Sequence, residues 1–168
     1  VPAIVAMTAS SLYNMIDSIF IGQGVGPLAI SGLAVTFPFM NLAAAFGALV
    51  GVGASTIVSV KLGQKDYASA RKALGNVVAL NIIIGVMFMV VSLLFLDKIL
   101  LFFGASENTL QYAREYMEII LYGNVVTHMY LGLNAVMRSG GHPQRSMAMT
   151  ILTVILNAIL DPIFIFVL

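Results

Sequence analysis

Long segments without charge dominate the sequence. Val1 to Val60 contains a single charged side chain, Asp17, and Leu74 to Leu96 contains none. About 20 consecutive apolar residues are enough for a helix to cross the hydrocarbon core of a bilayer. Only 9% of the residues are charged, whereas soluble domains carry about 25%. The pattern predicts an all-α fold, a polytopic bundle of transmembrane helices surrounded by membrane lipid.

Composition excludes several classes of function. The chain has no cysteine, which excludes a disulfide scaffold, a thiolate nucleophile and a cysteine-ligated metal. The net charge of +1 is spread without a basic patch, so nucleic acid is not an expected partner. The sequence contains no Ser/His/Asp, HExxH or Walker A arrangement. We therefore expect neither an enzyme nor a cofactor.

Apolar runs and the residues that interrupt them predict five spans. They cover about residues 2–21, 28–60, 70–96, 109–137 and 143–168. Asp66 and Ser106 are the candidate N-caps of the third and fourth spans. The second span is longer than one crossing requires, so a tilt or a break must absorb the excess. Candidate positions for a break are Gly47, Gly51 and Gly53.

The distribution of Lys and Arg predicts the orientation, because cytoplasmic loops are enriched in them. Basic residues gather at 61–72 and 138–145, whereas 22–27 has none and acids accompany those after residue 96. We expect a multi-pass protein of the cell or inner membrane with its amino end and both basic loops in the cytoplasm. The chain begins and ends within apolar runs, which predicts a piece of a longer protein.

Two acidic residues lie inside apolar spans, Asp17 in the first and Asp161 in the fifth. Each costs roughly 2.5 to 3.5 kcal/mol at a helix centre on insertion scales, and such residues usually mark ion or proton pathways. At about 1.5 Å of rise per residue, Asp17 lies roughly 7 to 8 Å below the outer end of its span. Asp161 lies at least about 10 Å below the outer end of the fifth. The two carboxylates are predicted at similar depth.

Each acid has polar neighbours on its own helical face, where residues three and four apart meet. These are Tyr13 and Asn14 before Asp17, and Asn157 before Asp161. If the two spans pack together, the five residues form one cluster. Carboxylate and amide oxygens at Asp17, Asn157 and Asp161 suit Na⁺, while two close carboxylates suit a shared proton because like charges raise one pKa. The alternatives are that Asp161 caps a break at Pro162 and that Asp17 extends to the outer surface.

Other polar residues in the spans favour packing. A lone histidine such as His128 is more often a hydrogen-bonded packing residue than a ligand. Asn41 and Asn81 are expected to bond across helices, and Gly47-x-x-x-Gly51 is typical of close helix approach.

The motifs around these residues resemble the multidrug and toxic compound extrusion (MATE) transporters. The resemblance rests on 13–22 in the first span, 51–63 at the end of the second, 138–143 before the fifth and 157–162 within it. The phrase around Asp17 is most similar to the branch named after the DNA-damage-inducible protein F. The four motifs occur in order and cover nearly the whole chain.

The resemblance implies helices 1 to 5 of the amino-terminal six-helix lobe of a two-lobe transporter. Such a protein is a secondary antiporter that expels organic cations or drugs in exchange for H⁺ or Na⁺. Asp17, Asn157 and Asp161 match the cation site of that lobe, Tyr13 matches its tyrosine, and Pro2 matches a proline at which the first helix is proposed to bend. The sixth helix and the second lobe would be partners from the same chain.

An intramembrane enzyme is disfavoured because the sequence has no catalytic constellation, and two further rivals remain open. One is a lipid-linked oligosaccharide flippase of the same superfamily, whose cavity is expected to hold more Arg and Lys than these spans contain. The other is a membrane scaffold without transport activity, which would have no reason to keep two buried acids at one depth.

Overall fold

The computed structural model describes residues 2–24 and 27–166. Within these ranges, the structure does not describe the side chains of residues 2, 3, 13, 14, 17, 18, 20–24, 27–29 and 160–166. The described residues form helices and turns, with no strand among them. The helices are α1 (Pro2–Gly24), α2 (Pro27–Gly63), α3 (Tyr67–Leu94), α4 (Leu96–Phe102), α5 (Glu107–Tyr122), α6 (Asn124–Ser139) and α7 (Pro143–Phe166).

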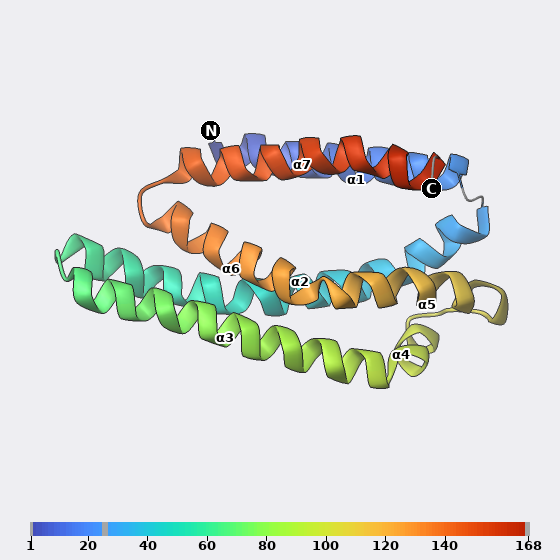
Figure 1. The fold of residues 1–168 in the computed structure, drawn as a ribbon, viewed down its shortest axis with the longest axis horizontal. Coiled ribbons are helices and arrows are strands. Elements are labelled where there is room, and N and C mark those ends of the chain that lie inside the picture. Colours follow the sequence, from blue (N-terminus) through green and yellow to red (C-terminus); the bar gives the residue numbers. More distant parts are fainter. Residues whose placement is uncertain (1, 25–26, 167–168) are drawn as a thin grey trace.

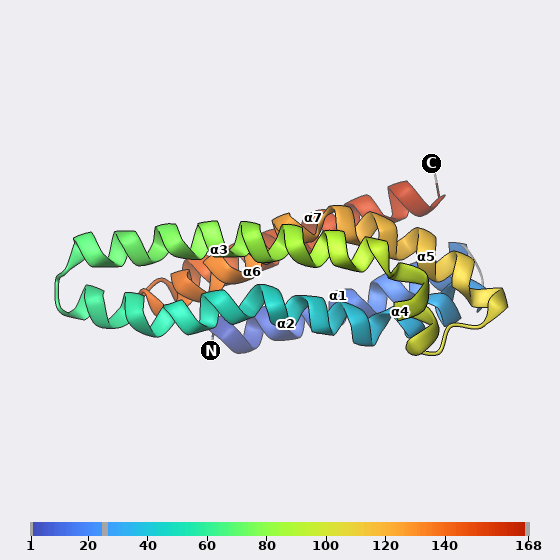
Figure 2. The same cartoon turned by 90° about the horizontal axis from the view of Figure 1, so that it is seen from below.

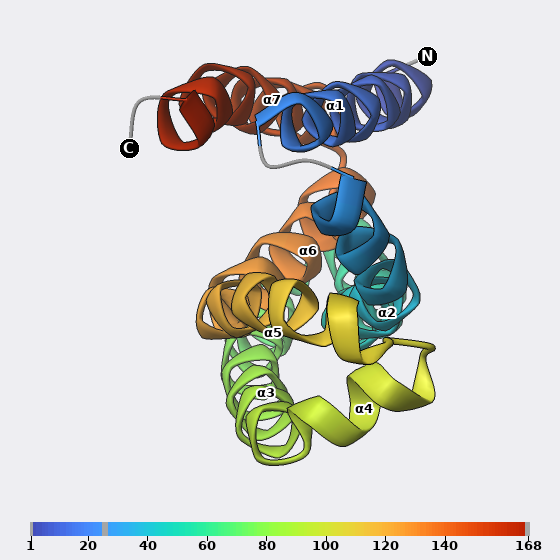
Figure 3. The same cartoon turned by 90° about the vertical axis from the view of Figure 1, so that its right-hand side faces the viewer.

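The helices are arranged in two parts. α2, α3, α5 and α6 pack against one another as a bundle, and the short α4 covers one end of it. α1 and α7 pack against each other as a separate layer, shown above the bundle in Figure 3. They run in the same direction, from the end that holds the amino terminus toward the end that holds α4 (Figure 1). The condition that the first and fifth spans pack together is therefore met.

The helices are long enough and apolar enough for a bilayer. α3 and α2, from Ile30 onward, each qualify as a membrane span among the described residues, and α5 and α6 qualify together as one bent span. α1 has 23 residues and α7 has 24, which exceeds the roughly 20 that cross the hydrocarbon core. Large apolar side chains face outward, including Ile119 and Val126 at 73% exposure each. Lipid, and not water, suits such a surface.

Two predicted spans differ in detail from the helices. The span expected at 109–137 is divided at Gly123, where α5 and α6 meet at 56°. By contrast, α2 is one helix of 37 residues that continues through Gly47, Gly51 and Gly53. At Gly51 an added Cβ would collide with the backbone of Gly132 in α6. The glycines of α2 therefore allow a close helix crossing and do not break the helix.

The two predicted caps lie where helices begin. The Asp66 carboxylate accepts a hydrogen bond from the Ser69 backbone N–H at 3.1 Å, which satisfies a free donor of α3. Ser106 precedes α5, and its backbone N–H donates to Thr109 Oγ1 at 2.9 Å. Local sequence therefore sets these boundaries.

Charge divides the molecule into two ends. The turns between α2 and α3 and between α6 and α7 lie at the same end as the amino terminus, as Figures 1 and 2 show. Six of the eight basic residues lie at or near these turns, with Asp66 as the acidic residue among them. α4 and the start of α5 lie at the opposite end. The asymmetry agrees with the predicted orientation, which stays a prediction.

Candidate functional site

The predicted cation site lies on the layer of α1 and α7. Asp17 belongs to α1, and Asn157 and Asp161 belong to α7. Because these helices are parallel neighbours, residues at similar distances from their starts lie at similar levels. Asp17 is 15 positions after Pro2, and Asp161 is 18 positions after Pro143. The pairing of α1 with α7 thus places the helix segment that contains Asp17 beside the one that contains Asp161.

The structure does not describe most of the side chains of the predicted site. This holds for Pro2, Tyr13, Asn14, Asp17 and Asp161, so their roles stay predictions. Asn157 is described and is half-buried. Among the described residues, no group of three or more His, Cys, Asp or Glu is placed to hold a metal ion.

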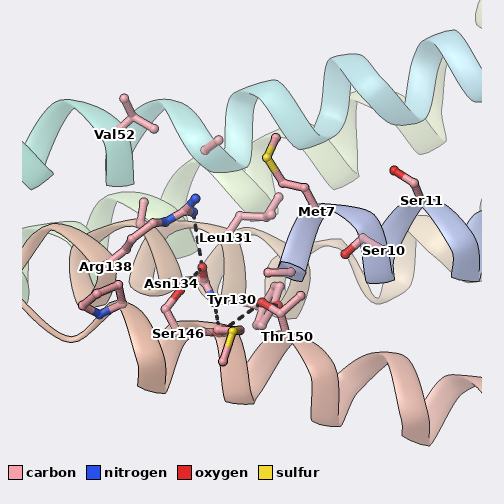
Figure 4. Close-up of a pocket in the computed structure, with 15 residues that line it drawn as sticks. Met7, Ser10, Ser11, Val52, Tyr130, Leu131, Asn134, Arg138, Ser146 and Thr150 are labelled. Carbon is pink, nitrogen blue, oxygen red and sulfur yellow. Dashed lines mark hydrogen bonds between the residues drawn. The ribbon is translucent and has the colours of Figure 1, made fainter. Parts of the chain in front are cut away.

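A pocket of about 410 Å³ opens between this layer and the bundle, close to the basic end. Its lining comes from α1, α2, α6 and α7, as Figure 4 shows. Met7, Val52 and Leu131 supply apolar surface, and Ser10 adds a hydroxyl from α1. The pocket therefore combines apolar walls with a few polar groups, which is the usual composition of small-molecule sites.

Hydrogen bonds between α6 and α7 organise the polar side of this pocket. The Ser146 hydroxyl donates to Asn134 Oδ1 at 2.8 Å, and the Tyr130 and Thr150 hydroxyls are 2.9 Å apart. Asn134 Nδ2 also donates to Thr150 Oγ1 at 3.4 Å. Figure 4 shows these residues facing one another. The network fixes the polar groups before any ligand enters.

Arg138 adds a positive charge at one end of the pocket. Its Nη2 donates to Asn134 Oδ1 at 3.4 Å, and the residue is exposed. Arg138 is the cationic residue in the described lining. A pyrophosphate-binding cavity would be expected to hold several basic side chains, which this lining does not provide.

Sequence reasoning did not single out this network. Tyr130, Asn134 and Arg138 are four residues apart on one helix, and Ser146 and Thr150 are four apart on the next. Such spacing places each set on one helical face. This spacing could have revealed the polar face of each helix. It could not have revealed that the two polar faces lie opposite each other.

A second group of polar residues lies inside the bundle. His128 and Asn81 are both 0% exposed. His128 Nδ1 lies 2.9 Å from the Asn124 carbonyl oxygen, in agreement with the packing interpretation. The expectation that Asn81 bonds across helices is wrong for the described residues, because both of its amide atoms and His128 Nε2 are buried without a hydrogen-bond partner. The Asn81 amide instead fills the space beside Gly132.

The apolar helices define a multi-pass membrane protein. The MatE family model matches residues 2–163, and the chain belongs to this family.

Curated relatives support the assignment. The chain is 32% identical over 165 residues to the multidrug export protein MepA of Staphylococcus haemolyticus, covering 98% of the chain and 36% of that protein. It is 31% identical over 165 residues to MepA of Staphylococcus aureus, covering 98% and 37%. The chain therefore spans about a third of the length of these relatives.

Solved structures share the arrangement. Structures of MATE in the straight and bent conformations each superpose with a TM-score of 0.90 at 29% identity. The superposition covers 98% of this chain and 36% of the straight structure, and 99% of this chain and 37% of the bent structure. A transporter of the MOP superfamily from Pyrococcus furiosus, described as having a binding pocket of reverse polarity, matches with a TM-score of 0.91 at 29% identity, over 98% of this chain and 36% of its own.

Proposed function

We propose that this chain forms helices 1 to 5 of the amino-terminal six-helix lobe of a secondary antiporter that exports drugs or organic cations in exchange for H⁺ or Na⁺. The parallel pairing of α1 and α7 carries the proposal, because it joins the two helices that contain acidic residues within apolar runs. The similarity to multidrug export proteins supports the same activity. The remaining helices of the transporter would come from the rest of the same chain.

In this proposal Asp17, Asn157 and Asp161 bind the coupling ion, with Tyr13 and Asn14 beside them. Either the carboxylate and amide oxygens coordinate Na⁺, or the two acids share a proton. Ion binding changes the charge between α1 and α7 and thereby favours one conformation of α1 over another. Pro2, at the cytoplasmic end of α1, is the proposed position of bending.

The pocket around Asn134 is the proposed contact of this lobe with the exported molecule. Methionine side chains adapt to ligands of different shape, and Met7 and Met147 both line the pocket. The hydroxyls of Tyr130 and Thr150, which are 2.9 Å apart, provide hydrogen-bonding groups at fixed positions. The pocket lies against α1, so a change in that helix would change the pocket.

The test is efflux from proteoliposomes that contain the full-length transporter, with pH and Na⁺ gradients imposed separately. Asp17→Asn and Asp161→Asn should each abolish ion-driven export while the protein still folds. Glu107→Gln is the matched control, because this exposed carboxylate lies at the start of α5. Wild-type export by either acid variant would contradict the proposed ion site, and export that neither gradient drives would contradict antiport.

A further inference from the structure

A groove of about 520 Å³ runs between α2 and α3, apart from the pocket around Asn134. Its floor includes the buried Val77 and the half-buried Ala54 and Ala73. Leu49 and Leu80, which are 62% and 46% exposed, form the end of the groove that is farther from the basic turn. Gly53 keeps it open, because a Cβ at this position would meet no atom within 4 Å. The groove therefore presents an apolar channel on the outer surface of the described bundle.

The length of the groove matches one leaflet of a bilayer. Along α3 the lining extends from Ser69 to Leu80, which is roughly 16 Å at 1.5 Å per residue. Half of a hydrocarbon core of about 30 Å is about 15 Å. A single acyl chain of a phospholipid can therefore lie along the groove.

The polar end of the groove is positively charged. Lys72 lines the groove and also an adjoining hollow of about 410 Å³, which it shares with Arg71 and Tyr67. Arg71 and Lys72 are exposed and make no hydrogen bond or ion pair with other described residues. Lys61, in contrast, lies 3.6 Å from the Asp66 carboxylate. Two cations without a partner among the described residues thus lie where the apolar channel reaches the basic end of the molecule.

We propose that the groove binds an anionic phospholipid, with one acyl chain between α2 and α3 and the headgroup phosphate on Arg71 and Lys72. Charge complementarity decides the class of lipid, because basic pockets beside transmembrane helices bind anionic headgroups. The groove and the pocket around Asn134 share no lining residue. The lipid proposal therefore does not depend on the proposed export activity.

The test is native mass spectrometry of the detergent-purified full-length transporter, titrated with dioleoyl phosphatidylglycerol and dioleoyl phosphatidylcholine. The wild type should retain phosphatidylglycerol more tightly. R71Q/K72Q should weaken its binding toward that of phosphatidylcholine, by about fivefold for each charge removed, which corresponds to about 1 kcal/mol per basic residue. Equal binding of the two lipids by the wild type would overturn the proposal.

A second pair of variants tests the apolar channel. Gly53→Leu should weaken retention of both lipids because the new side chain fills the groove. Gly75→Leu is the matched control: Gly75 also has no atom within 4 Å of an added Cβ, and it is outside the groove lining. Unchanged retention in Gly53→Leu, or an equal loss in both variants, would overturn the acyl-chain site.

One further measurement separates lipid from protein as the occupant. In a cysteine-free full-length background, Gly53→Cys should be protected from a small maleimide while lipid is bound and should react with it after delipidation in detergent. Protection from the maleimide that persists after delipidation in detergent would show that the rest of the chain covers the groove, and it would overturn the proposal.

Discussion

On one face of α6, Tyr130 and Asn134 line a pocket and share hydrogen bonds with α7. On the other face, His128 is enclosed by the bundle, and Gly132 adjoins a buried Asn81 that has no hydrogen-bond partner among the described residues. Two positions along a helix correspond to a rotation of about 200°. A single helix thus separates a polar surface that lines a pocket from one dominated by close packing. Substitutions should therefore act differently on the two faces.

The largest effect is expected where α2 crosses the packed face of α6. Gly51→Ala places a Cβ against the Gly132 backbone, so the helices must separate. Overpacking of this kind costs about 1–3 kcal/mol, occasionally more. Thermal unfolding of the full transporter in detergent measures it. Gly53→Ala, two positions away and without a nearby atom, is the control, and equal stability of the two variants would show that the crossing is loose.

A smaller loss is expected on the pocket face. Asn134→Ala removes the acceptor of Ser146 and a donor to Thr150, which should cost about 1–2 kcal/mol because each hydrogen bond contributes about 1 kcal/mol. Drug binding by the full transporter should weaken as well. Asn108→Ala, at an exposed position of α5, should change neither property. Normal drug binding by the Asn134 variant would show that this pocket does not contact the exported drug.

The packed face can be examined further with two buried asparagines. Asn124 Nδ2 donates to the Gly85 carbonyl oxygen at 3.3 Å, whereas the Asn81 amide has no such partner among the described residues. Since Asn→Ala removes the same atoms at both positions, Asn124→Ala should destabilise the protein by about 1 kcal/mol more than Asn81→Ala. Chemical denaturation provides the comparison. A larger loss at Asn81 would indicate that its amide has a partner in the membrane.

The smallest effect is expected far from α6, at the turn before α3. Hydrogen bonds from Ser69, aided by Lys61, hold the pKa of the Asp66 carboxyl below its ordinary value. The stabilisation is therefore complete above the pKa of an unfolded aspartate and is lost as the pH falls through the lower, folded value. Asp66→Ala should slightly lower thermal stability at neutral pH and show no difference from wild type in strong acid. A difference that persists there would exclude the carboxylate as its cause.

Several local features could be predicted from the sequence. The caps at Asp66 and Ser106, the helical spans and the close approach at Gly51 each depend on neighbouring residues or on a helix contact that small side chains permit. The bend at Gly123 could not be predicted, because an apolar run gives no sign of a change in direction. The pocket around Asn134 also escaped sequence analysis, since its polar groups come from different helices.

The sequence by itself determined that the chain forms membrane helices and that two acids lie within apolar segments, because hydropathy and helical spacing are local properties. Only the tertiary structure decided that α1 and α7 are neighbours, that α6 has a packed and a polar face, and that Gly53 opens a groove while Gly51 closes a crossing. The physical reason is that α1, α2 and α7 carry apolar side chains around most of their circumference. In lipid, hydrophobicity does not distinguish a packing face from an exposed one, so shape and hydrogen bonding make that choice.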